Sequence, residues 1–404
     1  MAWSSNLSMW FWSLQFALLN PVLAVLLTTV FGASGSEAGV VLAISNAAGL
    51  VASTVIPAAA DRHGKYVTGM VCSALCGIAF VGVLLATESL VVAAASMALL
   101  GAPTSVGATL LFAQLRHAGA APDALVRTRA VVSFAWVVGP PLSTLITSVA
   151  PGRTVLLLIG GIGLVNLLTS TLASRSARVR SGLWSRPARS EGASVRVRDA
   201  FRAPREWAAM VVFVTLQTLN IAAGTTMGLF VSTELRAPLP WAGAALGLAA
   251  LAEIPALVVL GRLLRVWSAH ALVLSGASVG AVYYLAVALV ESPVVLVLLQ
   301  PLNAWFFATV AGVGLTTFQD MIPAPGLATG TFANTGQVAA VLSGGFIALV
   351  AGRPGGYDTL YWICAGTAGF VAVSLIVRVC WRRGRCVGPP LSRSASARQG
   401  GRLG

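Results

Sequence analysis

Twelve apolar stretches, each long enough to cross a membrane as a helix, dominate the sequence and restrict what the chain can fold into. A helix needs about 20 mainly apolar residues to cross a bilayer. Of the 404 residues, 57% are hydrophobic and only 9% are charged, against about 25% charged in a typical soluble domain. We therefore predict an all-α membrane protein and exclude a soluble enzyme. The expected spans lie near 9–31, 36–60, 66–87, 89–113, 127–150, 154–173, 207–231, 238–261, 270–290, 293–315, 327–351 and 357–381.

One long polar segment divides these spans into two groups of six. Residues 174–206 contain nine Arg together with Ser and Pro, and they offer little apolar surface to bury. The sequence thus predicts an N-terminal six-helix bundle over 1–173, a cytoplasmic Arg-rich linker over 174–206 and a C-terminal six-helix bundle over 207–381. Residues 382–404 are expected to form a disordered, basic cytoplasmic tail.

The distribution of basic residues predicts the orientation of the chain. Of the 26 Lys and Arg residues, 23 fall on one side when loops are assigned alternately, and Arg153, Arg236 and Arg353 fall on the other. Basic loops stay in the cytoplasm. We therefore expect a multi-pass protein of the cell membrane with both termini and the linker in the cytoplasm. The net charge of +14 is explained by these loops, so no nucleic-acid partner is expected.

A faint internal repeat relates the two halves. Asn20 precedes Arg62 by 42 residues, and Asn220 precedes Arg262 by the same distance. Each Asn lies in the first span of its half, and each Arg follows the second span. Twelve spans arranged as six plus six, with a long central linker, resemble the major facilitator architecture, in which two bundles rock about a site near the membrane midplane.

The loop after the second span carries a possible gating motif. Asp61-Arg62-His63-Gly64-Lys65 resembles the family's Gly-x-x-x-Asp-Arg-x-Gly-Arg-Arg/Lys motif, with Pro57 in place of its first Gly and Tyr66 at its last basic position. An Asp at a helix end beside an Arg can pair with a neighbouring helix and hold one side shut. We assign gating to Asp61, Arg62, Gly64 and Lys65, with a plain basic inner loop as the alternative.

Polar side chains inside the spans are the candidates for ligand binding, because the bilayer otherwise excludes them. They are mostly neutral amides and indoles, a combination that suits a neutral polyhydroxyl ligand. Helix–helix hydrogen bonding is the alternative for each amide, above all for Asn46, Gln114 and Asn166. The candidate substrate-binding residues are Gln15, Asn20, Arg129, Trp136, Gln217, Asn220, Asn303, Trp305, Asn334 and Gln337.

Two further features within the spans have mechanical or chemical consequences. Glu253 is an acid within a span, where an ionised carboxylate is costly, so we expect it to be paired or protonated and assign it proton coupling. A structural ion pair or hydrogen bond is the alternative. Gly139-Pro140-Pro141 removes backbone hydrogen bonds from the fifth span, and we expect a bend there that acts as a hinge.

Four segments resemble the sugar efflux transporters, a group within the major facilitator superfamily: RAVVSFAWVVGPP (129–141), AEIPALVVLGR (252–262), LQPLNAWFFATVAGVGLTTFQDMIP (299–323) and TGTFANTGQVAAVLSGG (329–345). The resemblance implies export of sugars or glycosides against proton entry. Its matched positions are Arg129, Trp136, Glu253, Asn303, Gln319, Asp320 and Asn334, and we assign gating to Gln319 and Asp320.

Enzyme chemistry finds little support in the sequence. The three His lack metal-ligand spacing, and no Gly-Lys-Ser/Thr phosphate loop is present. We expect no cofactor and no metal, with a sugar, a proton and the lipid bilayer as partners of a monomer. Two alternatives stay open: a major facilitator that exports hydrophobic drugs, and a membrane receptor or scaffold that transports nothing.

Overall fold

The computed structural model describes residues 2–63, 65–117, 122–150, 153–180, 204–322, 325–351, 353 and 356–385. Within these residues, twelve helices are long and apolar enough to cross a membrane. This confirms the predicted all-α class and the number of spans.

Ten of the spans are single helices, and the fourth and tenth are divided into shorter pieces. The N-terminal half contains α1 (Ala2–Thr29), α2 (Gly35–His63), α3 (Tyr66–Ala86), α4 (Leu90–Ser96), the π-helix η1 (Met97–Gly101), α5 (Ala102–Thr104), α6 (Gly107–His117), α7 (Pro122–Val149) and α8 (Thr154–Arg180). The C-terminal half contains α10 (Pro204–Thr233), α11 (Pro240–Leu263), α12 (Ala269–Ala288), α13 (Pro293–Leu298), α14 (Gln300–Ala308), the π-helix η3 (Thr309–Val313), α15 (Gly314–Met321), α16 (Pro325–Ala351) and α17 (Gly356–Arg385).

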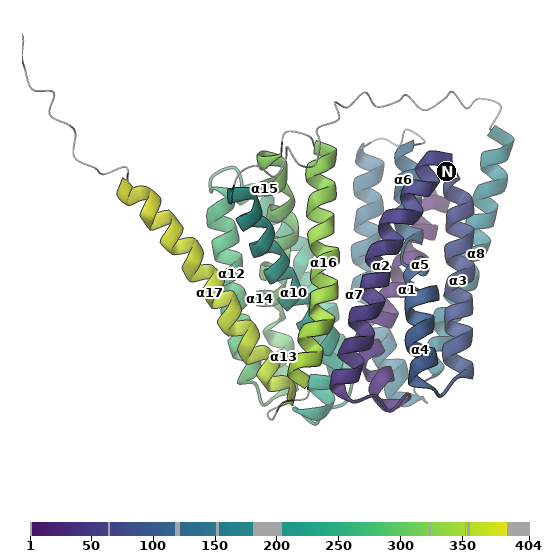
Figure 1. Cartoon of the computed structure of the whole chain (residues 1–404), viewed down its shortest axis with the longest axis horizontal. Helices are drawn as coiled ribbons and strands as arrows, with labels where there is room; N and C mark the ends of the chain where they lie inside the picture. The colour runs from purple at the N-terminus through teal and green to yellow at the C-terminus, as the bar shows by residue number, and fades with distance from the viewer. Residues whose placement is uncertain are drawn as a thin grey trace, which may run out of the picture.

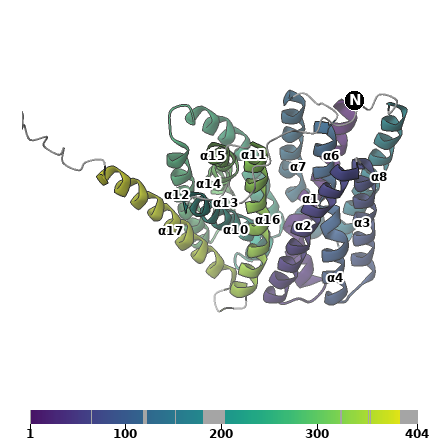
Figure 2. The same ribbon diagram turned by 45° about the horizontal axis from the view of Figure 1, so that its top comes forward.

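The helices form two groups that lie side by side: the N-terminal half runs from purple through blue to teal at α8, and the C-terminal half runs from teal at α10 through green to yellow (Figures 1 and 2). We call the end at which α1 begins and α8 ends the linker end, which is uppermost in Figure 1. The opposite end, at which α1 ends and α2 begins, is the far end. Short turns at the far end keep successive helices antiparallel.

Local signals in the sequence set the helix starts and connections at the far end. Ser34 and Glu37 form a capping box on α2: the Ser34 N–H donates to the Glu37 carboxylate (2.8 Å), and the Glu37 N–H donates to the Ser34 hydroxyl (3.2 Å). Arg153 donates to the carbonyl oxygens of Leu85 and Thr87 (3.2 and 2.8 Å), at the C-terminal end of α3 where a cation is favourable.

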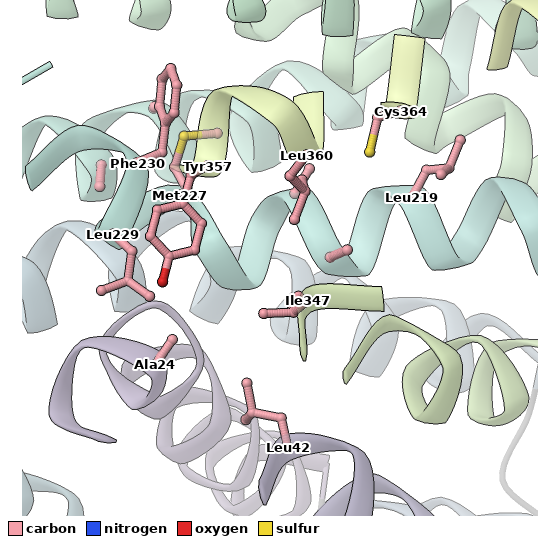
Figure 3. Packing of buried hydrophobic residues seen from close by; sticks show 14 of the residues in the cluster. Ala24, Leu42, Leu219, Met227, Leu229, Phe230, Ile347, Tyr357, Leu360 and Cys364 are labelled. Carbon is pink, nitrogen blue, oxygen red and sulfur yellow. The ribbon is translucent and has the colours of Figure 1, made fainter. Parts of the chain in front are cut away.

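The buried residues form two clusters that differ in which helices they join. The larger one continues across both halves: Ala24 of α1 and Leu42 of α2 lie toward Leu229 of α10 and Ile347 of α16 (Figure 3). The smaller one surrounds Trp12 and Met70, and all its buried members belong to the N-terminal half. The two halves thus share a core toward the far end, while the smaller core belongs to one half alone.

Large apolar side chains cover much of the outer surface. Val91, Val149, Val266 and Phe370 are each more than 70% exposed. A water-soluble protein seldom exposes so many large apolar side chains, and a lipid environment removes that cost. The chain is therefore a multi-pass membrane protein.

The helix ends differ in places from the predicted boundaries. α8 continues to Arg180 and α10 starts at Pro204, so both enter the segment 174–206 that we predicted as linker. α17 continues to Arg385 and so includes the first four residues of the predicted tail, 382–385. Residues 181–203 and 386–404 lie outside the described residues. The division into two bundles stays a prediction, as does disorder of the tail.

Candidate functional site

The first candidate site region lies where α1 and α10 part from one another. At Gly228 of α10 the two helices touch, since a Cβ there would lie 3.0 Å from the Pro21 carbonyl oxygen. One turn nearer the linker end, a Cβ at Gly224 would meet nothing within 4 Å. Asn20 of α1 is exposed although it lies mid-helix, beside this point of separation. The Cβ direction of Gly224 therefore faces open space, at about the level of the exposed Asn20.

Gln217 lies two turns nearer the linker end than Gly224, on the same side of α10. Its Nε2 donates to the Thr335 hydroxyl of α16 (2.7 Å), and a Cβ at Gly336 would approach its Oε1. On α16, Asn334 is exposed and Gln337 is half-buried. The structure thus brings Gln217 together with the segment 334–337 of α16.

Asn220 and Asn303 lie at one end of a chain of amides within the C-terminal half. Asn220 Nδ2 donates to Asn303 Oδ1 (3.3 Å), and Asn303 Nδ2 donates to Gln300 Oε1 (3.3 Å). Gln300 Nε2 in turn donates to the Leu296 carbonyl oxygen (3.0 Å) and to the Tyr283 hydroxyl (3.3 Å). Gln300 and Tyr283 are both 0% exposed, whereas Asn220 and Asn303 are half-buried. These hydrogen-bonded amides therefore lead from the buried Gln300 to the accessible Asn220.

Two candidate binding residues each have their hydrogen-bond partner in their own half, Gln15 in the N-terminal half and Trp305 in the C-terminal half. Gln15 of α1 is 4% exposed, and its Oε1 accepts from Asn166 Nδ2 of α8 (2.8 Å). Trp305 of α14 donates from Nε1 to the Ser275 hydroxyl of α12 (3.4 Å) and packs against the larger core. Because both side chains are partnered within their own half, their geometry favours helix packing over ligand contact.

The segment Gly139-Pro140-Pro141 lies where α7 meets two other helices. Gly139 packs directly against Ala17 of α1, and a Cβ at Gly247 of α11 would lie 2.6 Å from Pro141 Cγ. α7 is continuous from Pro122 to Val149 through both prolines. The hydroxyls of Ser143 and Thr144 donate to the Pro140 carbonyl oxygen (3.1 and 2.9 Å). This run therefore provides close contact between the halves, and its role as a hinge stays a prediction.

Trp136 and Glu253 lie on the pair of helices that meet there. Both side chains are half-buried, Trp136 one turn before Pro140 on α7 and Glu253 on the linker side of Gly247 on α11. Glu253 also interacts with other groups in the folded chain. Among the described residues, no group of three His, Cys, Asp or Glu side chains is arranged to hold a metal ion.

The predicted gating residues gather toward the linker end. Arg62 and Lys65 are exposed at the α2–α3 connection, and Gln319 and Asp320 are exposed near the end of α15. Asp61 lies in the last turn of α2 and Arg129 lies in α7, but their side chains lie outside the described residues, as does all of Gly64. Gating by these residues stays a prediction.

Sequence reasoning missed the contact that joins α2 to α16 toward the far end. Gly39 packs against Ala348, and a Cβ at Gly344 would lie 2.6 Å from Ala43 Cα. Next to these small residues, Asn46 Nδ2 donates to the Ala340 carbonyl oxygen (2.7 Å). The four-residue spacing of Gly35, Gly39 and Ala43 and of Gly344 and Ala348 is the signal that was available, because small residues at this spacing let membrane helices approach closely.

Comparison with known proteins decides the family. The family model described as Major Facilitator Superfamily matches residues 6–342. The chain belongs to the major facilitator superfamily. This major facilitator protein is therefore a transporter by family, in agreement with the prediction that it is not an enzyme.

Curated relatives support the more specific resemblance. The chain is 29% identical over 262 residues to sugar efflux transporter A of Escherichia coli (strain K12), an alignment that covers 62% of each chain. It is 28% identical over 363 residues to sugar efflux transporter A of Dickeya chrysanthemi, covering 83% of this chain and 85% of that one. The predicted similarity to the sugar efflux transporters is confirmed.

Solved structures support the fold. The structure of the nucleoside transporter NupG superposes with a TM-score of 0.75 at 12% sequence identity, covering 93% of this chain and 98% of that one. At this identity the likeness concerns the arrangement of the helices alone. It confirms the predicted major facilitator fold.

Proposed function

We propose that this protein exports neutral sugars or glycosides across the cell membrane by alternating access. The observation that carries this proposal is the character of the groups around the separation of α1 and α10. Asn20, Gln217 and Asn220 are neutral amides, and each amide offers both donors and acceptors of hydrogen bonds to hydroxyl groups. The similarity to sugar efflux transporters supports the same ligand class.

The contacts between the halves support an inward-facing state. The close approaches at Gly344, Gly228 and Gly247 all lie in the half of the helices nearer the far end. Basic loops stay in the cytoplasm, which assigns the linker end and both termini to that side. The space beside Asn20 is then open toward the cytoplasm, where an exporter loads its substrate.

Proton antiport is the proposed energy source, with Glu253 as the coupling group. Glu253 is half-buried on α11. This helix contacts α7 of the other half at Gly243 and Gly247. A change in that contact would alter the surroundings of the Glu253 carboxylate. The protein acts as a monomer in the lipid bilayer, and the sugar and the proton are its partners.

Transport into inside-out membrane vesicles tests the proposal. Vesicles that contain the protein should accumulate radiolabelled glucose, lactose or methyl β-D-glucoside when their lumen is acidified, and vesicles without the protein should not. Ethidium serves as the probe for the drug-export alternative. Accumulation of ethidium with no movement of any sugar would contradict sugar export. No movement of either probe would favour the receptor or scaffold.

A further inference from the structure

The buried end of the amide chain has a fixed direction of hydrogen bonding. The Leu296 carbonyl oxygen can only accept a hydrogen bond, so the side-chain group of Gln300 that faces it at 3.0 Å must be the N–H₂ group. This contact lies at the junction of α13, which ends at Leu298, and α14, which begins at Gln300. Gln300 is therefore held in one of its two amide orientations.

That orientation is passed along the chain to the accessible end. Gln300 Oε1 faces Asn303 and must accept, so Asn303 turns its Nδ2 toward Gln300 and its Oδ1 toward Asn220. Asn220 then donates from Nδ2 to Asn303 Oδ1 (3.3 Å). Its own Oδ1 is left directed away from Asn303. Each link is set by the previous one, since two acceptors or two donors facing each other would lose the hydrogen bond.

Two buried tyrosines lie near the two ends of this arrangement. The Tyr283 hydroxyl lies 3.4 Å from Gln300 Oε1 and 3.3 Å from its Nε2, so it contacts the amide at the anchored end. The Tyr284 hydroxyl is buried near Asn220 and forms no hydrogen bond of ordinary geometry. An amide oxygen has two lone pairs, so Asn220 Oδ1 keeps one for a ligand even beside Tyr284.

We propose that Gln300 and Tyr283 are positioning residues that fix Asn220 as a hydrogen-bond acceptor for one substrate hydroxyl. This inference rests on the proposed sugar export, and it assigns specificity to two residues that contact no substrate. A bound sugar must then donate from one hydroxyl to Asn220 Oδ1. A sugar that carries fluorine at that carbon cannot donate, although fluorine is close to a hydroxyl in size.

Substrate analogues test whether a sugar hydroxyl donates its hydrogen bond to Asn220. Competition against radiolabelled glucose uptake is measured with the monodeoxy and monodeoxyfluoro glucoses in inside-out vesicles. At one ring position, we expect the deoxy and the fluoro sugar both to compete about tenfold more weakly than glucose, because the hydrogen bond to the half-buried Asn220 is lost in each case. Asn220→Leu should reduce this difference to about twofold or less.

Variants at the buried end separate positioning from ligand contact. Gln300→Met keeps the volume but removes the anchor, so Asn303 and Asn220 become free to rotate. Its discrimination between glucose and the fluoro sugar should fall from about tenfold to about twofold, with a smaller change in the maximal rate. Tyr283→Phe is a milder change at the same end and should lower discrimination in the same direction. Gln300→Glu, with its carboxyl protonated, preserves the donor and acceptor directions and should restore discrimination.

Tyr361→Phe is the matched control, because it also removes a buried hydroxyl from the C-terminal half. The Tyr361 hydroxyl is 0% exposed and donates to the Ala223 carbonyl oxygen (3.2 Å), outside the amide chain. The Tyr361→Phe variant should discriminate between glucose and the fluoro sugar as well as the unaltered protein does. If Tyr283→Phe and Gln300→Met also leave discrimination unchanged while glucose is transported, the positioning role is wrong and sugar export stands. If the unaltered protein moves no sugar, sugar export and this inference are both contradicted.

Discussion

Asn46 of α2 donates a hydrogen bond of 2.7 Å to the backbone carbonyl oxygen of Ala340 in α16, and so links the two halves of the molecule across 294 residues of sequence. The bond lies next to the closely packed glycines at the far end. Alternating access requires that this contact breaks when the far end opens. The Asn46 bond is therefore expected to stabilise the state seen here over one that is open at the far end.

Asn46→Leu should shift the protein toward opening at the far end. Hydrogen bonds between membrane helices contribute about 0.6–2 kcal/mol, which corresponds to roughly a three- to thirtyfold change in the ratio of the two states. The measurement is the distribution of distances between spin labels at the far ends of α2 and α16. A longer population should appear in Asn46→Leu. An unchanged distribution would show that this bond does not bias the two states.

Two adjacent glycines of α16 provide a matched test of close packing between the halves. A Cβ at Gly344 would lie 2.6 Å from Ala43 Cα, whereas a Cβ at Gly345 would meet nothing within 4 Å. Gly344→Ala should therefore destabilise the closed far end by about 1–3 kcal/mol, as overpacking does. Gly345→Ala should have little effect. The rate at which a far-end cysteine reacts with an impermeant maleimide reports the opening, and equal rates in both variants would contradict the account.

The Gln15–Asn166 pair predicts a loss of stability rather than a direct loss of binding. Asn166→Leu leaves the buried Gln15 Oε1 without the donor that it has at 2.8 Å. An unsatisfied buried acceptor costs about 1–3 kcal/mol, so the midpoint of thermal unfolding in detergent should fall. Asn20→Ala, at the exposed face of the same helix, should raise the KM for sugar with a smaller change in that midpoint. The opposite pattern would assign ligand contact to the buried pair.

Glu253→Gln tests proton coupling. The change preserves the shape and hydrogen-bonding capacity of the side chain but removes its ability to release a proton. Uphill accumulation driven by a pH gradient should be lost, while sugar counterflow at equal pH should continue. Accumulation that still follows the pH gradient in Glu253→Gln would exclude Glu253 as the coupling group.

The sequence allowed the spans to be predicted well, because the length and hydropathy of each stretch are local properties. It did not predict the π-helices η1 and η3, or the continuation of α8 to Arg180. The π-helices depend on how neighbouring helices pack, and the extension of α8 depends on helix propensity beyond its apolar stretch. α7 continues through Pro140 and Pro141 as one helix, and the bend expected there stays a prediction.

Individual polar residues were harder to assign than the spans. The sequence singled out Gln15 and Asn20 equally, yet one is buried against Asn166 and the other is exposed mid-helix. Which face of α1 meets α8 depends on tertiary packing, and hydropathy alone does not contain that information. Gln300 was visible three residues before Asn303, but its role became apparent only with the position of Tyr283, on a different helix.

Counterflow of radiolabelled sugar in proteoliposomes tests the central claim most directly. Proteoliposomes loaded with unlabelled glucose, lactose or methyl β-D-glucoside, and diluted into the same labelled sugar, need no proton gradient and no knowledge of orientation. The account predicts transient accumulation of label for at least one of these sugars, with the KM raised about tenfold or more in Asn220→Leu. Accumulation with an unchanged KM in that variant would contradict the assigned site, and no counterflow of any of the three would contradict sugar transport itself.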